Sequence, residues 1–367
     1  MAYLNHAGTS WPKPGPVRAA VAEALETPAD RWGERFDHDH RFVARAFGIA
    51  DASRLLLTPG CTSALSVAIA DLPWERGDRV LTSGLEHNAL VRPVSKLAAR
   101  GVEWGVVPRD EAGPLSLERL EDELRRGRVR LVAMTAACNV TGELLPFARV
   151  AELAHEYGAL CLIDAAQVAG WLPLDVTTLG ADMLAFAGHK GLQAPWGIGG
   201  LYVAPHVTMD VPGATCELRP GEVPACAPMP GYCDTGSVDR CALAGLVAGL
   251  GWLEQQPERL ARARGQLAEL TEALERLGWR VHGVRDPAGR LPSVALGLGA
   301  HPASEVVSAL NEVGVQVGAG ELCAPLAYES LCVESAGVCR VSLGPAHRAE
   351  ELEAALEAFR EVTKRLG

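Results

Sequence analysis

The chain has 367 residues, 48% of them hydrophobic, which is more than one compact core usually holds and too apolar for a disordered protein. Its formal charge of −11, with Lys and Arg scattered along the chain, argues against nucleic acid or anionic lipid as a ligand. No apolar run approaches the ~20 residues that span a bilayer, and the first residues lack a signal-peptide pattern. We therefore expect a cytoplasmic protein of two domains that acts on small molecules.

The ten cysteines form no Cys-x-x-Cys pair, so most are expected to be buried free thiols in a reducing compartment. Cys216, Cys226, Cys233 and Cys241 lie close together in the sequence, but their irregular spacing argues against a zinc site. We expect no bound metal.

Helical and strand patterns alternate over the first two thirds of the chain. Helices are expected at 16–26 and 146–158, the first with Pro16 in its opening turn. Short apolar segments rich in β-branched residues predict strands at 53–60, 78–84, 129–137, 158–167, 182–188 and 197–205. Strands separated by helices predict a mainly parallel sheet that is covered on both faces, which is an α/β architecture.

The pattern changes after about Val238. Residues 242–278 predict a long helical stretch with a break near Pro257. Strands at 279–284, 291–299 and 338–345 and helices at 303–314 and 348–367 then predict a smaller α+β unit. We expect residues 16–245 to form a large domain and 246–367 a small one, with residues 1–15 associated with the small domain.

Polar side chains follow several of the predicted strands: Thr62, Glu86, His87, Asn88, Asp164, Gln167, His189 and Lys190. Ligands of parallel sheets bind beyond the carboxyl ends of the strands, so these side chains are candidates for one site. Each alone has an ordinary explanation, such as a helix cap or a surface histidine. Together they match the needs of pyridoxal phosphate. These are a lysine amine, a carboxylate for the ring nitrogen, a donor to the ring oxygen, a flat group over the ring and a phosphate cradle at a helix start.

Eight segments carry a resemblance to a known family. They are YLNHAGTSWPKP, TPGCTSAL, LEHNALVRP, CNVTGELLP, IDAAQVAGWLPLDV, FAGHKGLQAPWGIGGLYV and the pair GAGELCAPLA and GVCRVSLGP. In order and spacing they resemble the cysteine desulfurases, which are class V aminotransferases and pyridoxal-phosphate enzymes of fold type I. The resemblance implies a large domain with a mainly parallel seven-stranded sheet and a smaller α+β C-terminal domain.

The resemblance also implies roles for individual residues. Lys190 would form a Schiff base with the cofactor, which explains a lysine at the end of an apolar run. Asp164 would pair with the pyridine nitrogen, Gln167 with the phenolic oxygen, and His87 would stack on the ring and shuttle protons. The phosphate contacts would be Thr62, His189 and Ser237. Because Ser237 matches a position that reaches into the partner subunit's site, a two-fold homodimer with shared sites is implied.

The same resemblance assigns the substrate side of the site. Cys323 matches the nucleophilic cysteine, and Arg340 matches the arginine that clamps the substrate carboxylate, assisted by Asn139. The implied reaction removes sulfur from L-cysteine or a derivative through a Cys323 persulfide and leaves alanine. A sulfur-acceptor protein is an expected partner.

Three departures from the family pattern bear on the substrate. Gly318 replaces an arginine five residues before the nucleophile, and Ala187 replaces a hydroxyl residue two positions before His189. Residues 30–48 also form a shorter segment than the family's first long helix and loop.

Two other classes of function stay open. A C–S lyase or aminotransferase keeps Lys190 and Asp164 without needing Cys323, and a sulfur-relay or assembly module would not need Lys190.

Overall fold

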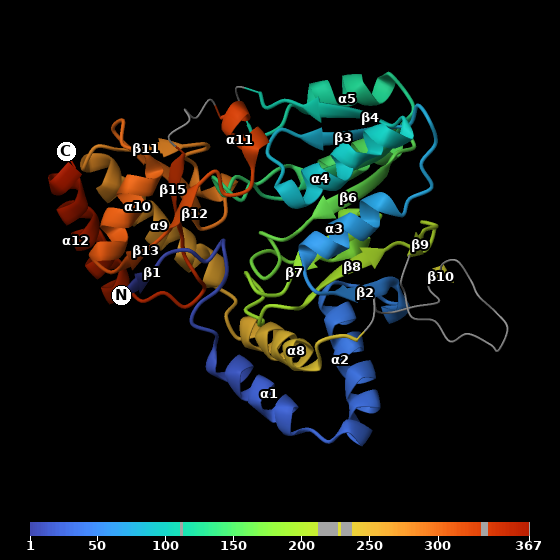
Figure 1. Ribbon diagram of the computed structural model, residues 1–367, viewed down its shortest axis with the longest axis horizontal. Helices are drawn as coiled ribbons and strands as arrows, with labels where there is room; N and C mark the ends of the chain where they lie inside the picture. Colours follow the sequence, from blue (N-terminus) through green and yellow to red (C-terminus); the bar gives the residue numbers. More distant parts are fainter. Residues whose placement is uncertain (111–112, 212–226, 229–236, 332–336, 367) are drawn as a thin grey trace.

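The computed structural model describes the chain except for residues 111–112, 212–226, 229–236, 332–336 and 367 (Figure 1). Cys216, Cys226 and Cys233, three of the cysteines weighed as zinc ligands, lie outside the described residues. No helix in the described part of the chain is both long and apolar enough to cross a membrane.

A seven-stranded sheet forms the first unit, with the strand order β2-β8-β7-β6-β5-β3-β4. Its strands are β2 (Leu55–Thr58), β3 (Arg79–Ser83), β4 (Glu103–Val107), β5 (Val129–Thr135), β6 (Leu160–Asp164), β7 (Met183–Ala187) and β8 (Gly199–Val203). Only β8 runs antiparallel to its neighbours, β2 and β7, and the remaining pairs in this sheet are parallel. The mainly parallel seven-stranded sheet is therefore confirmed.

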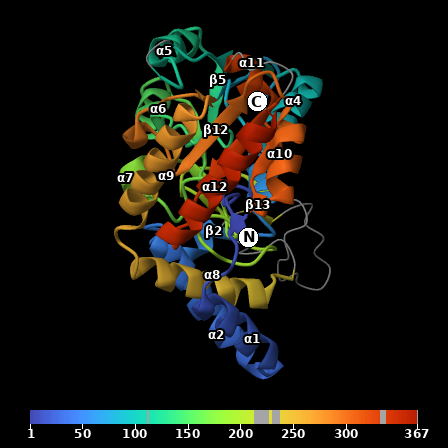
Figure 2. The ribbon, with the colours of Figure 1, turned by 90° about the vertical axis from the view of Figure 1, so that its left-hand side faces the viewer.

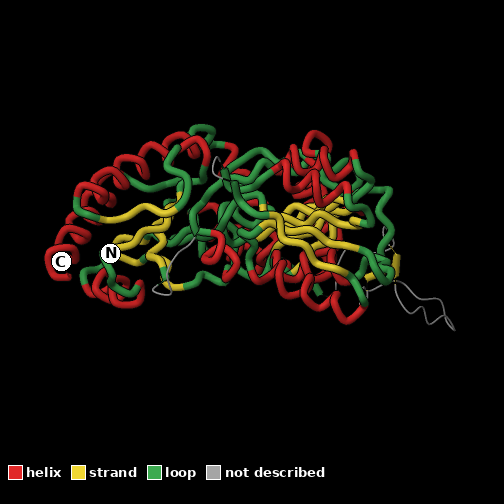
Figure 3. Tube along the Cα trace, turned by 90° about the horizontal axis from the view of Figure 1, so that it is seen from above, coloured by secondary structure: helices red, strands yellow, loops and turns green. Residues whose placement is uncertain are grey.

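Helices cover both faces of this sheet (Figure 3). In β5, Leu131 and Ala133 pack toward α3 (Cys61–Ala70) and α4 (Asn88–Lys96), whereas Val132 and Met134 pack into the core on the opposite face. That second core includes α5 (Leu117–Arg125), α6 (Phe147–Glu156) and α7 (Val176–Leu179). The two-residue period of the strand thus sends alternate apolar side chains into two separate helix layers.

A four-stranded antiparallel sheet forms the second unit, in the order β11-β12-β15-β14. Its strands are β11 (Trp279–His282), β12 (Ser293–Leu298), β14 (Gly318–Gly320) and β15 (Val338–Ser342), and its helices are α9 (Arg259–Arg276), α10 (Ala303–Glu312), α11 (Pro325–Ser330) and α12 (Ala349–Leu366). At the N-terminus, β1 (Ala2–Tyr3) pairs in parallel with β13 (Val315–Gln316), so the chain begins beside this second unit (Figure 2).

Helices α1 (Gly15–Glu26), α2 (Trp32–Ala46) and α8 (Arg240–Glu254) pack together at the lower edge of the molecule in Figure 1. The expected break near Pro257 is confirmed, because α8 ends at Glu254 and α9 begins at Arg259. The expected boundary at residue 245 falls inside α8 and stays a prediction. The short strands β9 (Asp210–Val211) and β10 (Ala227–Pro228) pair with each other at the far side of the first sheet.

A buried carboxylate of the first unit, Glu143, forms an ion pair within that unit and a hydrogen bond to the second unit. Both guanidinium Nη atoms of Arg109 donate to Glu143, each at 2.8 Å, and the Glu143 side chain is 0% exposed. The same carboxylate accepts from the Thr141 hydroxyl at 2.7 Å and from the backbone N–H of Val284, which follows β11, at 3.0 Å. Burial alone would raise the pKa of Glu143, but the hydrogen bonds from Arg109 and Thr141 outweigh burial and hold it below its ordinary value.

We predict that Arg109→Met destabilises the protein by about 3–5 kcal/mol, because it leaves the Glu143 charge buried and unpaired. Arg149→Met is the matched control, since Arg149 pairs with Glu152 on the exposed face of α6 and its loss should cost little. The pKa of Glu143 is depressed in the folded state. The pair's contribution is therefore present above the unfolded pKa of about 4.3 and is lost as pH falls through the folded value. Denaturant unfolding at neutral and acid pH measures both effects, and equal destabilisation by the two variants would contradict the prediction.

Candidate active site

Seven of the ten predicted site residues line one pocket of about 240 Å³ at the carboxyl ends of the parallel strands: Thr62, His87, Asn139, Asp164, Gln167, His189 and Lys190. Arg340 contacts Asn139 from β15, and Cys323 lines an adjoining groove. Ser237 is exposed and lines neither this pocket nor that groove. Elements far apart in the sequence meet here because parallel strands all present their carboxyl ends at the same edge.

Asp164 is the last residue of β6, and Lys190 follows the neighbouring parallel strand β7. Asp164 is 3% exposed, and its Oδ1 accepts from the Ala166 N–H at 2.9 Å and from the Cys61 thiol at 3.4 Å. Burial lowers the pKa of Lys190, and the nearby Asp164 carboxylate opposes that shift. The pair therefore combines an amine that loses its proton readily with a buried carboxylate that a cationic ring nitrogen can complement.

His87 caps the start of α4, and its Nδ1 accepts a hydrogen bond from the Ala89 N–H at 3.0 Å. Burial first, and then the charge of Lys190, lowers the pKa of His87. Because Nδ1 is an acceptor, the neutral ring carries its proton on Nε2. Gln167 is fixed from the other side by a 3.1 Å hydrogen bond from its amide to the carbonyl of Ala7.

Arg340 is a buried guanidinium without a carboxylate partner among the described residues. It is 4% exposed, its Nη1 donates to the carbonyl of Asn139 and its Nη2 to Oδ1 of Asn5, both at 2.7 Å. Its Nε is buried without a hydrogen-bond partner, and so is Oδ1 of Asn139. Buried polar atoms normally find partners, so these two atoms indicate a place for a small polar ligand, and the guanidinium suits a carboxylate.

Gly318 explains how Arg340 fits. A Cβ at this position would lie 3.0 Å from Oδ1 of Asn5 and 3.2 Å from both Nε and Nη2 of Arg340. The glycine thus allows β14 to pass close to the guanidinium. The residue that departs from the family pattern is therefore packed directly against the Arg340–Asn5 hydrogen bond.

Cys323 is exposed on a loop whose backbone is held in an uncommon conformation. Leu322 has φ +50° and Cys323 has φ +58°, which is the left-handed region that non-glycine residues rarely adopt. The carbonyl of Leu322 accepts from Asn139 Nδ2 at 2.8 Å, and the carbonyl of Cys323 accepts from the Asn88 N–H at 2.7 Å. These two hydrogen bonds hold the backbone of the loop in place, and the Cys323 thiol therefore lies beside the mouth of the pocket.

The N-terminal segment is a part of the site to which sequence reasoning gave no role. The carbonyl oxygen of His189 accepts from the Ser10 N–H at 2.9 Å, the Ser10 hydroxyl at 3.0 Å, the Thr9 hydroxyl at 3.1 Å and Lys13 Nζ at 3.0 Å. Lys13 also lies 5.8 Å from the ring centre of Trp196, which lines the pocket. Four donors on one carbonyl fix the peptide that carries Lys190.

Glu86 is a second residue without a predicted role. Its carboxylate is fully buried, accepts from the Ser83 hydroxyl at 2.5 Å and from the Thr135 N–H at 2.9 Å, and burial raises its pKa to about 8. In the sequence Glu86 stood only among the polar residues that follow predicted strands, directly before His87. Other residues without a predicted role that line or brace the pocket include Asn5, Cys61 and Trp196.

Comparison with known proteins agrees with this geometry. The Aminotransferase class-V family model matches residues 16–355. A cysteine desulfurase of Escherichia coli O157:H7 is 30% identical over 95% of this chain and 87% of its own length. The chain belongs to the cysteine desulfurase family. A probable cysteine desulfurase of Methanothermobacter thermautotrophicus is 27% identical over 98% of this chain and 94% of its own. The apo structure of a cysteine desulfurase from Thermococcus onnurineus NA1 has a TM-score of 0.90 at 25% identity, covering 100% of this chain and 95% of that one.

As a member of this family of class-V aminotransferases, the protein is a pyridoxal-phosphate-dependent enzyme. The residues present fit that cofactor. The pocket combines the Lys190 amine and buried Asp164 with the start of α3 at Thr62, where backbone N–H groups can receive a phosphate. Ala187 lines the same pocket without a hydroxyl group, so that phosphate contact of the family is missing.

We predict that Lys13→Met weakens binding of pyridoxal phosphate to the apoprotein by about tenfold, because a charge-assisted hydrogen bond of roughly 1.5–3 kcal/mol to the His189 carbonyl is lost. Lys364→Met, on the exposed side of α12, is the control and should bind as the wild type does. Titration of apoprotein with cofactor, followed by absorbance, measures the affinity. Unchanged affinity in Lys13→Met would mean that the remaining three donors suffice.

Proposed function

We propose that the protein removes sulfur from L-cysteine and leaves alanine, with Cys323 as the residue that takes the sulfur. The observation that carries this proposal is the position of Cys323. The backbone carbonyl of the exposed Cys323 accepts from the Asn88 N–H, and that of Leu322 accepts from Asn139 Nδ2. The carbonyl of Asn139 in turn accepts from Arg340, whose guanidinium has no carboxylate partner among the described residues. A carboxylate bound by Arg340 thus lies near both a nucleophile and Lys190.

Each residue has a separate task in this proposal. Arg340, with Asn139, binds the substrate carboxylate, since Nε of Arg340 is free to donate. Lys190 would hold the cofactor through its amine, and the same amine would accept the Cα proton of the substrate. Pyridoxal phosphate, when bound, supplies the electron sink for that step, and Asp164 keeps its ring nitrogen protonated. His87, which lines the pocket, would move protons through Nε2.

Sulfur transfer uses the Cys323 thiolate. Its Sγ attacks the substrate sulfur, a sulfur–sulfur bond forms, and the bond between that sulfur and the substrate Cβ breaks. The electron pair of the broken bond stays with the carbon fragment, which is protonated and leaves as alanine. Cys323 is left as a persulfide, which a thiol acceptor must discharge before the next turnover.

We infer that the enzyme works in the cytoplasm as a two-fold homodimer and passes its sulfur to a separate acceptor, which can be a protein. Ser237 supports the dimer, because a side chain expected at the phosphate is exposed and does not line the pocket of its own chain. A second copy could receive it. Sedimentation of the purified protein tests the dimer.

We predict that Cys323→Ser still binds L-cysteine, because Arg340, Asn139 and Lys190 remain, but loses alanine formation by about a hundredfold or more. Binding is followed through the change in cofactor absorbance, and turnover through alanine and sulfide. Cys241→Ser, at the start of α8 and outside the pocket, is the control and should turn over normally. Alanine and sulfide at the parental rate would remove Cys323 from the mechanism, and pyruvate as product would indicate a C–S lyase.

A further prediction concerns the cofactor link. Lys190→Ala should lose the borohydride-reducible visible absorbance of the bound cofactor, because Lys190 is the only lysine that lines the pocket. Lys364→Ala should retain it. A reducible chromophore that persists in Lys190→Ala would show that another amine carries the cofactor. If neither the wild type nor Lys190→Ala bound the cofactor, the alternative of a non-enzymatic sulfur-relay module would gain support.

A further inference from the structure

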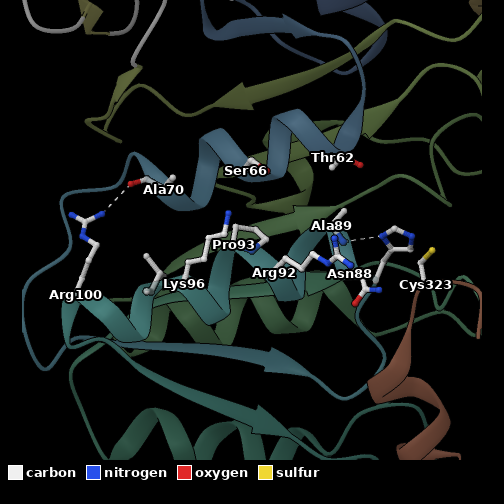
Figure 4. Close-up of a pocket in the computed structure, with 12 residues that line it drawn as sticks. Thr62, Ser66, Ala70, Asn88, Ala89, Arg92, Pro93, Lys96, Arg100 and Cys323 are labelled. Carbon is white, nitrogen blue, oxygen red and sulfur yellow. Dashed lines mark hydrogen bonds between the residues drawn. The ribbon is translucent and has the colours of Figure 1, made fainter.

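A second cavity of about 530 Å³ continues outward from the active site. It is a groove between α3 on one side and α4 with the following 3-10 turn η3 (Leu97–Arg100) on the other (Figure 4). Thr62, His87 and Ala89 line both this groove and the cofactor pocket, and Cys323 stands at its inner end. The groove is therefore a route by which a second molecule can reach the Cys323 thiol.

The groove is cationic although the protein is not. Arg92, Lys96 and Arg100 line it at intervals of four residues, so they lie along one face of α4 and η3, with Arg92 the nearest to Cys323 along that face (Figure 4). None of the twelve lining residues is acidic. Within the part of the chain that the structure describes, Arg92 and Lys96 form no ion pair, whereas Arg100 donates to the carbonyl of Ala70.

Unpaired cations in a groove attract anions, and the rest of the lining favours a small molecule. Pro93 and Leu97 give the groove an apolar floor, and its volume lies in the range of small-molecule sites, about 300–1,000 Å³. Side chains four residues apart on a helix are about 5–6 Å apart at Cβ, a spacing that Arg92 and Lys96 can use to hold two carboxylates of one compound.

We propose that this groove binds the sulfur acceptor, and that the acceptor is a low-molecular-weight thiol carrying at least two negative charges. This inference rests on the proposed function, because it needs the Cys323 persulfide. The thiolate of the acceptor attacks the outer sulfur of the persulfide, a new sulfur–sulfur bond forms, and the bond to Cys323 Sγ breaks. The electron pair returns to Cys323 as thiolate, and the acceptor leaves as its own persulfide, with no external oxidant or reductant.

The experiment measures how the charge of a thiol affects its rate. The holoenzyme is loaded with L-cysteine, freed of excess substrate, and mixed with mercaptosuccinate, 2-mercaptoethanol or cysteamine, which are dianionic, neutral and cationic. Each rate of discharge is divided by that thiol's rate with a small persulfide in solution, which removes intrinsic reactivity. We expect mercaptosuccinate to exceed 2-mercaptoethanol by about tenfold or more at low salt, and the advantage to shrink as salt is added.

Two double variants identify the groove as the cause. In Arg92→Glu/Lys96→Glu the order should invert, so that cysteamine becomes the preferred thiol. Arg41→Gln/Lys364→Gln removes two exposed cations of α2 and α12, outside the groove, and should keep the wild-type order. Inversion is informative because damage to folding lowers all three rates together and cannot reverse their order.

The outcomes separate this inference from the function on which it rests. A persulfide that forms but shows no charge preference, or the same preference in the glutamate variant, overturns the groove proposal and leaves the desulfurase proposal standing. Failure of Cys323 to form a persulfide overturns both. Rapid discharge only by an added acidic protein, with mercaptosuccinate no faster than 2-mercaptoethanol, would replace the small acceptor by a macromolecular one.

Discussion

The hydrogen bonds to the carbonyl oxygen of His189 hold the two halves of the site together. The donors come from residues 9–13, which follow directly on a strand paired with the second unit, while His189 follows a strand of the first sheet. The same N-terminal segment accepts from Gln167 at Ala7 and from Arg340 at Asn5. One stretch of chain thus fixes the proposed cofactor lysine, the proposed ring-oxygen donor and the proposed carboxylate clamp relative to one another, which is the kind of preorganisation that catalysis requires.

The elements that the sequence predicted correctly are those with strong local signals. β5, β6 and β7 are apolar runs buried on both faces, and polar residues directly follow each of them, so both the sheet and most of the pocket could be inferred. β4 was missed because it is an edge strand, and its exposed Trp104 and Val106 sit beside Glu103 in a segment without an apolar run. β1, β13 and β14 are two or three residues long, too short to show any period.

The contacts that complete the site could not be inferred from any local pattern. Asn5 and Arg340 are 335 residues apart in the sequence, and Gln167 and Ala7 are 160 apart. Such pairs depend on how the two units pack against each other, and the type of a residue does not predict a hydrogen-bond partner so far away in the sequence. Glu86 is different: it stood beside His87 in the sequence, but its role depends on burial against Ser83 and Thr135, which only the packed strands reveal.

Two buried charged residues differ in their partners. Glu143 has an oppositely charged partner, which suits a structural role, whereas Arg340 has only neutral partners in the described part of the chain, which suits a role in ligand binding. Glu143 has Arg109 and Thr141 as partners within its own unit, and it also accepts from the backbone N–H of Val284 in the second unit. Arg340 is as deeply buried, but its direct partners are a carbonyl and an amide oxygen, and burial lowers its pKa to about 10. A cation without an anion is costly in a folded protein, so its retention indicates that the charge is completed by a ligand. Gly318 fits this interpretation. An arginine there would place a second cation against Arg340, whereas the glycine leaves Asn5 as the neutral partner and Arg340 as the sole guanidinium of this clamp among the described residues.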